Sequence, residues 1–294
     1  MKLFAFGLGY SACDFIARYG SAFDTIYGTV RDTEKPRAMP DGQPLTTLIL
    51  DREQEDPAIT AALAETDVII ISVPPGISVD PVLGKFGRRL AALPQNLTII
   101  YLSTIGVYGD HKGDWVDEDQ TPTPTSGRSA TRVSAEKSWM ALARDPRKTL
   151  HILRLAGIYG PQRNALEALR RGTAHRIVKP NQVFNRIHVA DISAAIAAVL
   201  SYEGGSEIWN LADDEPSPPQ DVVTYAAELM GIEPPPEQDF ETANLSPMGL
   251  SFYGENKRAS NRKLKQKLGL TLAFPTYREG LTALWEAGEG RTQA

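Results

Sequence analysis

The chain has 294 residues, of which 42% are hydrophobic and 23% are charged, and its formal net charge is -5. This composition is typical of a soluble globular protein with one large domain or two modest ones. The negative charge gives no electrostatic reason to expect binding to nucleic acid or to an anionic membrane. One cysteine excludes an intramolecular disulfide, and together with four scattered histidines it forms no zinc-type cluster, so we expect no metal.

The first thirteen residues, MKLFAFGLGYSAC, allow two interpretations. They resemble the export signal of a lipid-anchored protein, and they also fit a strand that runs into a phosphate-binding turn. The uninterrupted apolar run 3–6 is short of the roughly 7–15 residues of a signal-peptide core. Cys13 is followed by Asp14 and a helix-like segment rather than by a tether. We therefore expect a cytoplasmic protein, with no apolar run near the roughly 18 residues that span a bilayer.

The first half of the chain alternates short apolar runs with helix-like segments. Several of the runs are continuous in Val, Ile and Leu, as in strands buried on both faces of a parallel sheet. The predicted strands are 2–7, 25–30, 46–51, 67–73, 97–104 and 150–157, and the predicted helices are 11–20, 55–65, 80–93 and 128–144. Alternation at this spacing predicts an α/β fold, a Rossmann-type doubly wound parallel sheet.

The regular alternation of predicted strands and helices ends at about residue 160. Helices are predicted near 160–172, 191–203 and 217–231, short extended pieces near 175–189, a strand near 207–214, and two helices after 257. Ser217, with Gln220 three residues on, has the pattern of a capping box. The basic stretch 257–267 is a candidate nucleic-acid patch, but Leu264 and Leu268 repeat at i, i+4 and favour a helix with one apolar face.

These patterns predict a Rossmann domain and a smaller lobe. We assign 1–162 to the dinucleotide-binding domain, with 186–212 returning to it, and 163–185 with 213–294 to a C-terminal substrate lobe. No internal repeat is visible.

A glycine-rich turn follows the first predicted strand. Gly7, Gly9 and Ala12 have the spacing G-x-G-x-x-A between a strand and a helix. In a dinucleotide-binding loop the first glycine allows the sharp turn, the second lets the backbone approach a pyrophosphate, and the small third residue lets helix and strand pack closely. Tyr10 and Ser11 complete the predicted contact segment. The alternative is a plain glycine turn.

The end of the second strand bears on which dinucleotide is bound. Arg31 directly follows that strand and Asp32 comes next. An arginine pairs with the 2′-phosphate of NADP, whereas an acidic residue bonds the ribose hydroxyls of NAD. We expect NADP, with NAD as the alternative, unless both residues are merely solvated charges. Further predicted cofactor contacts are Asp51, Val73 and Pro74.

Several later stretches together resemble the extended short-chain dehydrogenase/reductase group, also called the NAD-dependent epimerase/dehydratase family. They occur in the family's order and cover most of the chain: STIGVYGD (103–110), VDEDQTPTP (116–124), LRLAGIYGP (153–161), RIHVADI (186–192) and WNLADDEP (209–216). The resemblance implies a Rossmann-type sheet that carries NAD(P) and a C-terminal lobe that shapes a substrate pocket.

The resemblance also implies a catalytic set, which this chain matches only in part. The family uses a Ser or Thr after the fifth strand, where this chain has Thr104, and a Y-x-x-x-K pair on the next long helix. That pattern falls on Arg128 and Arg132, with Glu136 after them. Arg132 could donate to the ribose as the lysine would, but a guanidinium at Arg128 moves no proton near neutral pH. The alternatives are a strand end for Thr104 and a surface i, i+4 ion pair for Arg132 and Glu136. The chain thus resembles atypical members of the family.

Another group must then move any proton. Tyr108, Tyr159 and His111 follow strands at the edge where ligands of such sheets bind, and each is otherwise a structural tyrosine or an exposed loop histidine. We name Thr104, Arg132 and Tyr108 as the candidate catalytic residues, and Thr104 and Arg132 also as cofactor contacts. The match at Asp191 is interpreted as structural, a cap for the following helix.

We therefore expect an NADP(H)-dependent oxidoreductase or an enzyme of epimerase/dehydratase type, acting on a small polar substrate, for which a sugar-nucleotide-like compound is one option. The alternative is a catalytically silent NADP(H)-binding redox or nucleotide sensor. The resemblance also implies a homodimer through the helices 80–93 and 128–144.

Overall fold

The computed structural model describes residues 1–31, 45–50, 56–76 and 79–291. The chain forms two compact units, each built from segments that are distant in sequence. Unit 1 comprises Met1–Val107, Gly127–Arg154 and Ile192–Trp209, and unit 2 comprises Tyr108–Ser126, Leu155–Asp191 and Asn210–Ala294.

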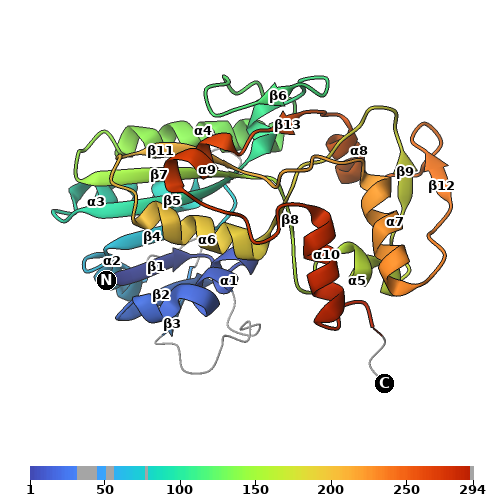
Figure 1. The fold of residues 1–294 in the computed structure, drawn as a ribbon. Helices are drawn as coiled ribbons and strands as arrows, with labels where there is room; N and C mark the ends of the chain where they lie inside the picture. Colours follow the sequence, from blue (N-terminus) through green and yellow to red (C-terminus); the bar gives the residue numbers. More distant parts are fainter. Residues whose placement is uncertain (32–44, 51–55, 77–78, 292–294) are drawn as a thin grey trace. The chain divides into compact units, whose positions relative to one another are not determined.

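A seven-stranded sheet carries the first unit, and its strand order is β11-β7-β5-β4-β1-β2-β3 (Figure 1). The pairings of β1 with β2 and β4, of β2 with β3 and of β4 with β5 are parallel. The strands are β1 (Lys2–Phe6), β2 (Thr25–Val30), β3 (Leu45–Ile49), β4 (Val68–Ile71), β5 (Leu97–Thr104), β7 (Lys148–Leu155) and β11 (Glu207–Leu211). The chain therefore has the predicted α/β Rossmann-type fold.

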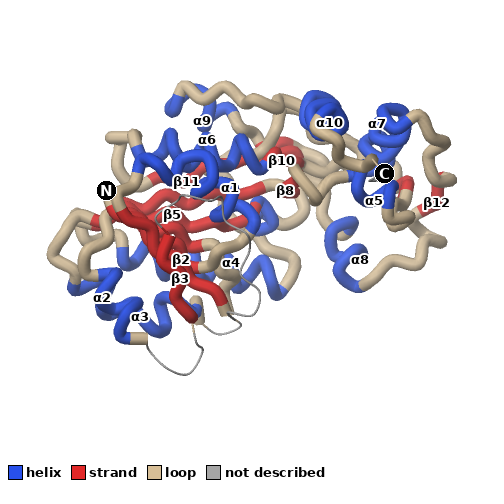
Figure 2. The backbone as a smooth tube through the Cα atoms, turned by 90° about the horizontal axis from the view of Figure 1, so that it is seen from below, coloured by secondary structure: helices blue, strands red, loops and turns tan. Residues whose placement is uncertain are grey.

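Helices cover both faces of this sheet (Figure 2). Helices α2 (Pro57–Leu63), α3 (Pro81–Ala92) and α4 (Gly127–Leu142) share one apolar core with β1, in which the rings of Phe6 and Phe86 lie 5.6 Å apart and Trp139 is fully buried. Helices α1 (Tyr10–Tyr19) and α6 (Val189–Leu200) lie on the other face, where the Ser193 hydroxyl donates to the Asp14 carboxylate at 2.6 Å.

The second unit is built around three helices rather than a large sheet. Helices α5 (Ala165–Arg170), α7 (Pro219–Met230) and α10 (Tyr277–Glu286) share a core that includes Leu166, Ala226 and Leu281. Three two-stranded parallel ladders accompany them: β10 (Arg186–His188) with β8 (Gly157–Tyr159), β12 (Glu237–Asp239) with β9 (Arg176–Val178), and β13 (Arg258–Ala259) with β6 (Trp115–Val116). The remaining elements of the second half are α8 (Pro247–Tyr253) and α9 (Arg262–Leu268).

Two predicted helix caps are wrong. Helix α7 begins at Pro219 without a side-chain cap, and the Ser217 hydroxyl instead accepts a hydrogen bond from Arg186 at 2.9 Å. Asp191 lies inside α6, and its carboxylate accepts from the backbone of Ala273 and Phe274 at 2.7 and 3.1 Å. In both cases a contact distant in sequence takes the side chain that local spacing assigned to a cap.

Helix α9 has the apolar face predicted for it, because Leu264 is fully buried between cationic neighbours. In the described part of the chain, no helix is long and apolar enough to cross a membrane. Among the same residues, no group of three or more His, Cys, Asp or Glu side chains could hold a metal ion.

Candidate dinucleotide site

The loop after β1 has the backbone that its glycines predict. Gly7 has a φ of +89°, a conformation that residues with a Cβ rarely adopt, and a Cβ there would lie 2.8 Å from a methyl carbon of Val73. The Gly7 N–H donates to the Thr29 hydroxyl at 2.9 Å, and the Leu8 N–H donates to the Thr29 carbonyl at 2.8 Å. The loop is thus fixed between the ends of β2 and β4, the strands on either side of β1.

Helix α1 starts directly at this loop, and its N-cap residue is a glycine, which has no side chain to cap the helix. Gly9 is the N-cap residue with extended backbone, no acidic residue occupies the first turn, and Ala12 is fully buried against the sheet. Uncapped N–H groups and the positive end of the helix dipole favour a negatively charged group at this point. Ser11 is buried and Tyr10 half-buried in the same turn.

The other predicted cofactor contacts lie partly along this edge. Arg31 is exposed at the end of β2, and Val73 lies against Gly7 in the loop after β4, with Pro74 exposed beside it. Asp51 lies outside the residues that the structure describes, as does Asp32.

Thr104 ends β5 with its side chain half-buried. Its hydroxyl oxygen accepts the Gly106 N–H at 3.1 Å, and this bond leaves the hydroxyl hydrogen available for donation. A Cβ on Gly106 would lie 3.0 Å from the Ser129 hydroxyl oxygen, so α4 approaches the loop closely at this glycine. Thr104 therefore has a fixed position from which to donate a hydrogen bond.

Arg132 is held by the sheet. Its Nη1 donates to the Leu102 carbonyl at 2.8 Å and to the Tyr101 hydroxyl at 3.1 Å. Burial raises the pKa of Tyr101 to about 12, so this hydroxyl stays protonated. Arg128, one turn earlier on α4, is exposed. The role of Arg132 toward a ribose stays a prediction, and its visible role is to fasten α4 to β5.

Glu136 does not form the surface ion pair with Arg132 that i, i+4 spacing offers. It is 2% exposed, and its carboxylate accepts from Arg154 Nη2 at 2.8 Å and from the Ser103 hydroxyl at 2.5 Å. Arg154 is equally buried, on β7. The pair joins α4 to two strands of the sheet inside unit 1, and nothing in the local sequence pattern indicates it.

The candidate tyrosines both belong to unit 2, where their hydroxyls have protein partners. Tyr108 is fully buried and donates to the Asn210 side-chain oxygen at 2.7 Å. Tyr159 is 8% exposed, donates to the Thr276 carbonyl at 3.3 Å, and has a pKa raised above its usual value by burial. His111 Nε2 lies 3.1 Å from the Tyr108 carbonyl. This geometry favours the structural interpretation of Tyr108 and Tyr159.

Thr29 is the member of this site that the sequence interpretation missed. It is 1% exposed and holds the Gly7 turn through its hydroxyl and its carbonyl. The available signal was weak, because Thr29 is one of three hydroxyl residues in the predicted strand 25–30.

Comparison with known proteins finds solved structures that are similar to this chain. No protein-family model matches the chain, and no curated protein matches it. A conserved protein of unknown function from Silicibacter pomeroyi DSS is 42% identical, with a TM-score of 0.88 over 98% of this chain and 99% of that one. This chain belongs to the same family.

Enzyme structures share the fold of this family at lower identity. The dTDP-glucose 4,6-dehydratase from Bacillus anthracis str. Ames, in complex with NAD, is 16% identical with a TM-score of 0.76, over 98% of this chain and 97% of that one. The UDP-glucuronic acid 4-epimerase from Bacillus cereus, in complex with NAD, is 17% identical with a TM-score of 0.75, over 97% and 96%. The resemblance to epimerases and dehydratases found in the motifs is confirmed at the level of the fold.

Proposed function

We propose that unit 1 binds NADP(H) at the loop between β1 and α1 and that the protein is an NADP(H)-dependent oxidoreductase or an enzyme of epimerase/dehydratase type. One observation carries the proposal: the left-handed Gly7 turn leads into a start of α1 that has a glycine as its N-cap residue and no acidic residue in its first turn. A dinucleotide pyrophosphate has the charge that such a helix start attracts. The two enzymes of the same fold described above were solved with NAD.

The residues present fit a dinucleotide. Gly9 has no side chain at the point where a phosphate would approach the first turn, and a side chain at position 7 would collide with Val73. Arg31 is exposed at the end of β2, the position from which a side chain reaches the adenosine ribose in this fold. Its guanidinium would pair with the 2′-phosphate that distinguishes NADP from NAD.

Isothermal titration calorimetry tests the binding proposal. The protein should bind NADPH more tightly than NADH, and Arg31→Ala should weaken NADPH binding by about 10- to 100-fold, the value of a charge-assisted hydrogen bond. NADH binding should not change in this variant, and Arg128→Ala, which removes an exposed arginine from α4, should change neither. If neither dinucleotide binds, the proposal is wrong.

The catalytic part of the proposal rests on Thr104. When bound, the nicotinamide supplies or accepts the hydride. Thr104 would donate its hydroxyl hydrogen to a substrate oxygen, because its own oxygen is already oriented by the Gly106 N–H. The substrate class proposed is a small polar carbonyl or hydroxyl compound, and sugar nucleotides belong in the test panel because the enzymes of the same fold act on them.

A silent NADP(H) sensor is the second candidate, and one set of contacts favours it. Arg132 is bonded to the sheet and Tyr108 is buried against Asn210, so neither of these two candidate side chains is placed to move a proton. Following NADPH absorbance across the panel separates the two candidates. Turnover that falls at least about 100-fold in Thr104→Ala, as expected for a lost polarising donor, supports the enzyme. NADPH binding without turnover of any compound supports the sensor.

A further inference from the structure

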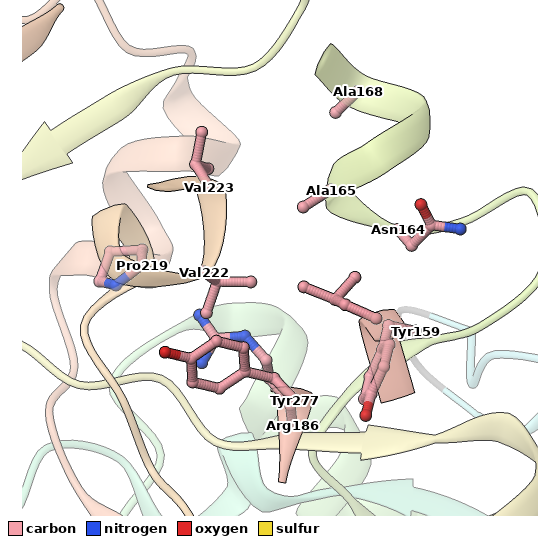
Figure 3. Close-up of a pocket in the computed structure, with 10 residues that line it drawn as sticks. Tyr159, Asn164, Ala165, Ala168, Arg186, Pro219, Val222, Val223 and Tyr277 are labelled. Carbon is pink, nitrogen blue, oxygen red and sulfur yellow. The ribbon is translucent and has the colours of Figure 1, made fainter. Parts of the chain in front are cut away.

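Unit 2 contains a cavity of about 300 Å³ between its three core helices. Ala165 and Ala168 of α5 face Val222 and Val223 of α7 across it (Figure 3). Leu281 of α10 adds to the same apolar wall. Every residue that lines the cavity belongs to unit 2, whereas the loop between β1 and α1 belongs to unit 1.

A single cation lies at one end of this apolar space. Arg186, on β10, lines the cavity beside Tyr277 (Figure 3), with its guanidinium carbon 5.9 Å from the centre of that ring. Its Nη1 is fixed by the Phe184 carbonyl at 3.1 Å and by the Ser217 carbonyl and hydroxyl at 3.2 and 2.9 Å. Among the described residues, its Nε and Nη2 have no hydrogen-bond acceptor and its guanidinium makes no ion pair. The Nη1 group is thus held by the protein, and the N–H groups of Nε and Nη2 can still donate to a ligand.

Asp213 is the acidic residue that acts most strongly on Arg186, but in the described part of the chain the two form no ion pair. Asp213 is 2% exposed, and one of its carboxylate oxygens is buried without a hydrogen-bond partner in the described structure. Burial raises the pKa of Asp213 to about 8, and the charge of Arg186 acts in the opposite direction. Arg186 is half-buried, and an anion in the cavity would add to the negative charge near its guanidinium.

The cavity also receives the start of α7. Pro219, the first residue of that helix, lines it, and the first turn of the helix carries one acidic residue, Asp221. We propose that the cavity binds a small monocarboxylate with an apolar tail, its carboxylate on the free edge of Arg186 and its tail between α5 and α7.

The chemistry of the lining selects this class of ligand. The fork of a guanidinium matches the two oxygens of a carboxylate. A phosphate dianion would need more donors than one anchored arginine gives, and a sugar would need polar partners that the alanine and valine walls lack. A cavity of about 300 Å³ accommodates a carboxylate with a branched or phenyl tail.

Calorimetric titration of the full chain with 3-phenylpropanoate, 4-methylpentanoate and the neutral 3-phenylpropanamide tests the proposal. At least one acid should bind and raise the melting temperature, and 3-phenylpropanamide should bind at least about tenfold more weakly, as expected for the loss of a charge-assisted pair. Equal binding of acid and amide, or no binding of either acid, would overturn the proposal.

Two variants locate the site. Ala168→Phe fills the cavity without touching Arg186 and should abolish binding, while Arg186→Lys keeps the charge but loses the fork and should weaken it. Arg278→Gln is the matched control, because this arginine follows Tyr277 but is exposed and bonded to Glu215. Because Arg186 also supports the backbone, Ala168→Phe decides the matter if Arg186→Lys fails to fold. Acid binding that survives in Ala168→Phe would show that the cavity is not the site.

Discussion

His151 is a buried histidine that the fold holds neutral. It is 1% exposed on β7, and the Trp209 indole N–H donates to its Nδ1 at 3.2 Å. An imidazolium could not accept that bond, and burial lowers the pKa of His151 to about 4. Because the unfolded chain would bind this proton near pH 6.5 and the folded chain only near pH 4, acidification between these values favours unfolding.

We expect His151 to make unit 1 sensitive to acid. Between pH 7.5 and pH 5 the free energy of unfolding should fall by about 2 kcal/mol more in the natural chain than in His151→Gln. Urea denaturation at the two pH values measures this difference, and His175→Gln, at an exposed histidine, is the control. An equal fall in the natural chain and in His151→Gln would contradict the assignment.

Glu136 and Arg154 form a buried ion pair on which α4 depends. Glu136→Gln would leave the buried guanidinium without its carboxylate charge, and we expect a loss of about 3–5 kcal/mol in the free energy of unfolding. The double variant Glu136→Gln/Arg154→Met should lose less than the sum of its single changes, since it removes both charges. Chemical denaturation measures both, and Lys137→Gln, at an exposed neighbour on α4, should be close to neutral.

At the level of elements, the loop between β1 and α1 contains two glycines that differ in backbone conformation. Gly7 has a φ of +89°, whereas Gly9 has a φ of -82°, which alanine adopts without strain. We expect Gly7→Ala to lower the free energy of unfolding by about 1–3 kcal/mol and to abolish dinucleotide binding. Gly9→Ala should lose binding with a much smaller change in stability, because its Cβ would meet only the movable Ser72 hydroxyl. Thermal denaturation and calorimetry compare the two, and equal melting temperatures would count against the turn as described.

The elements of the sheet could be predicted because their signal is local. Short, mainly apolar runs such as 68–71 and 97–104 are typical of inner strands of a parallel sheet, and the structure has them as β4 and β5. The two-residue strands β6 and β13 carry no such signal, because each exists only through pairing with the other. Helix α8 also went unpredicted; its seven residues follow a run of prolines and polar residues.

In the candidate site, too, local features could be predicted from the sequence and contacts distant in sequence could not. Gly7 and Gly9 were predictable, since their backbone demands follow from adjacent elements. The partners of Arg132 and Tyr108 were not, because Leu102 and Asn210 lie 30 and 102 residues away and only the folded chain selects them. Arg186 and Ser217, which are bonded to each other, gave no sequence signal of a cavity for the same reason.

At the scale of the whole molecule, the exposed face of α4 is suited to self-association. Its exposed positions 130, 134, 138 and 141 are occupied by Ala or Ser, and such small residues let two helices approach closely. Helix α3, the other predicted dimer helix, contacts α4. Homodimerisation through this face stays a prediction.

Light scattering coupled to size exclusion tests it. We expect a mass twice that of the 32.1 kDa chain, shifted toward the monomer in Ser134→Lys, which places a long cation in the small-residue face. Lys263→Ser on α9 is a control that should leave the mass unchanged. A natural chain of monomer mass at micromolar concentration would rule the dimer out.

The helix α10 has a consequence for how the chain is made. Its Tyr277 and Leu281 complete the core with α5 and α7, and its Gly280 approaches Tyr159 so closely that any Cβ would collide with that ring. Unit 2 is therefore assembled from segments whose contacts close only across more than a hundred residues. During synthesis, α5 and α7 emerge with apolar faces that stay uncovered until residue 286 has been added. All strands of the seven-stranded sheet have therefore been synthesised by residue 211, whereas the core of unit 2 is completed only when α10 has been synthesised.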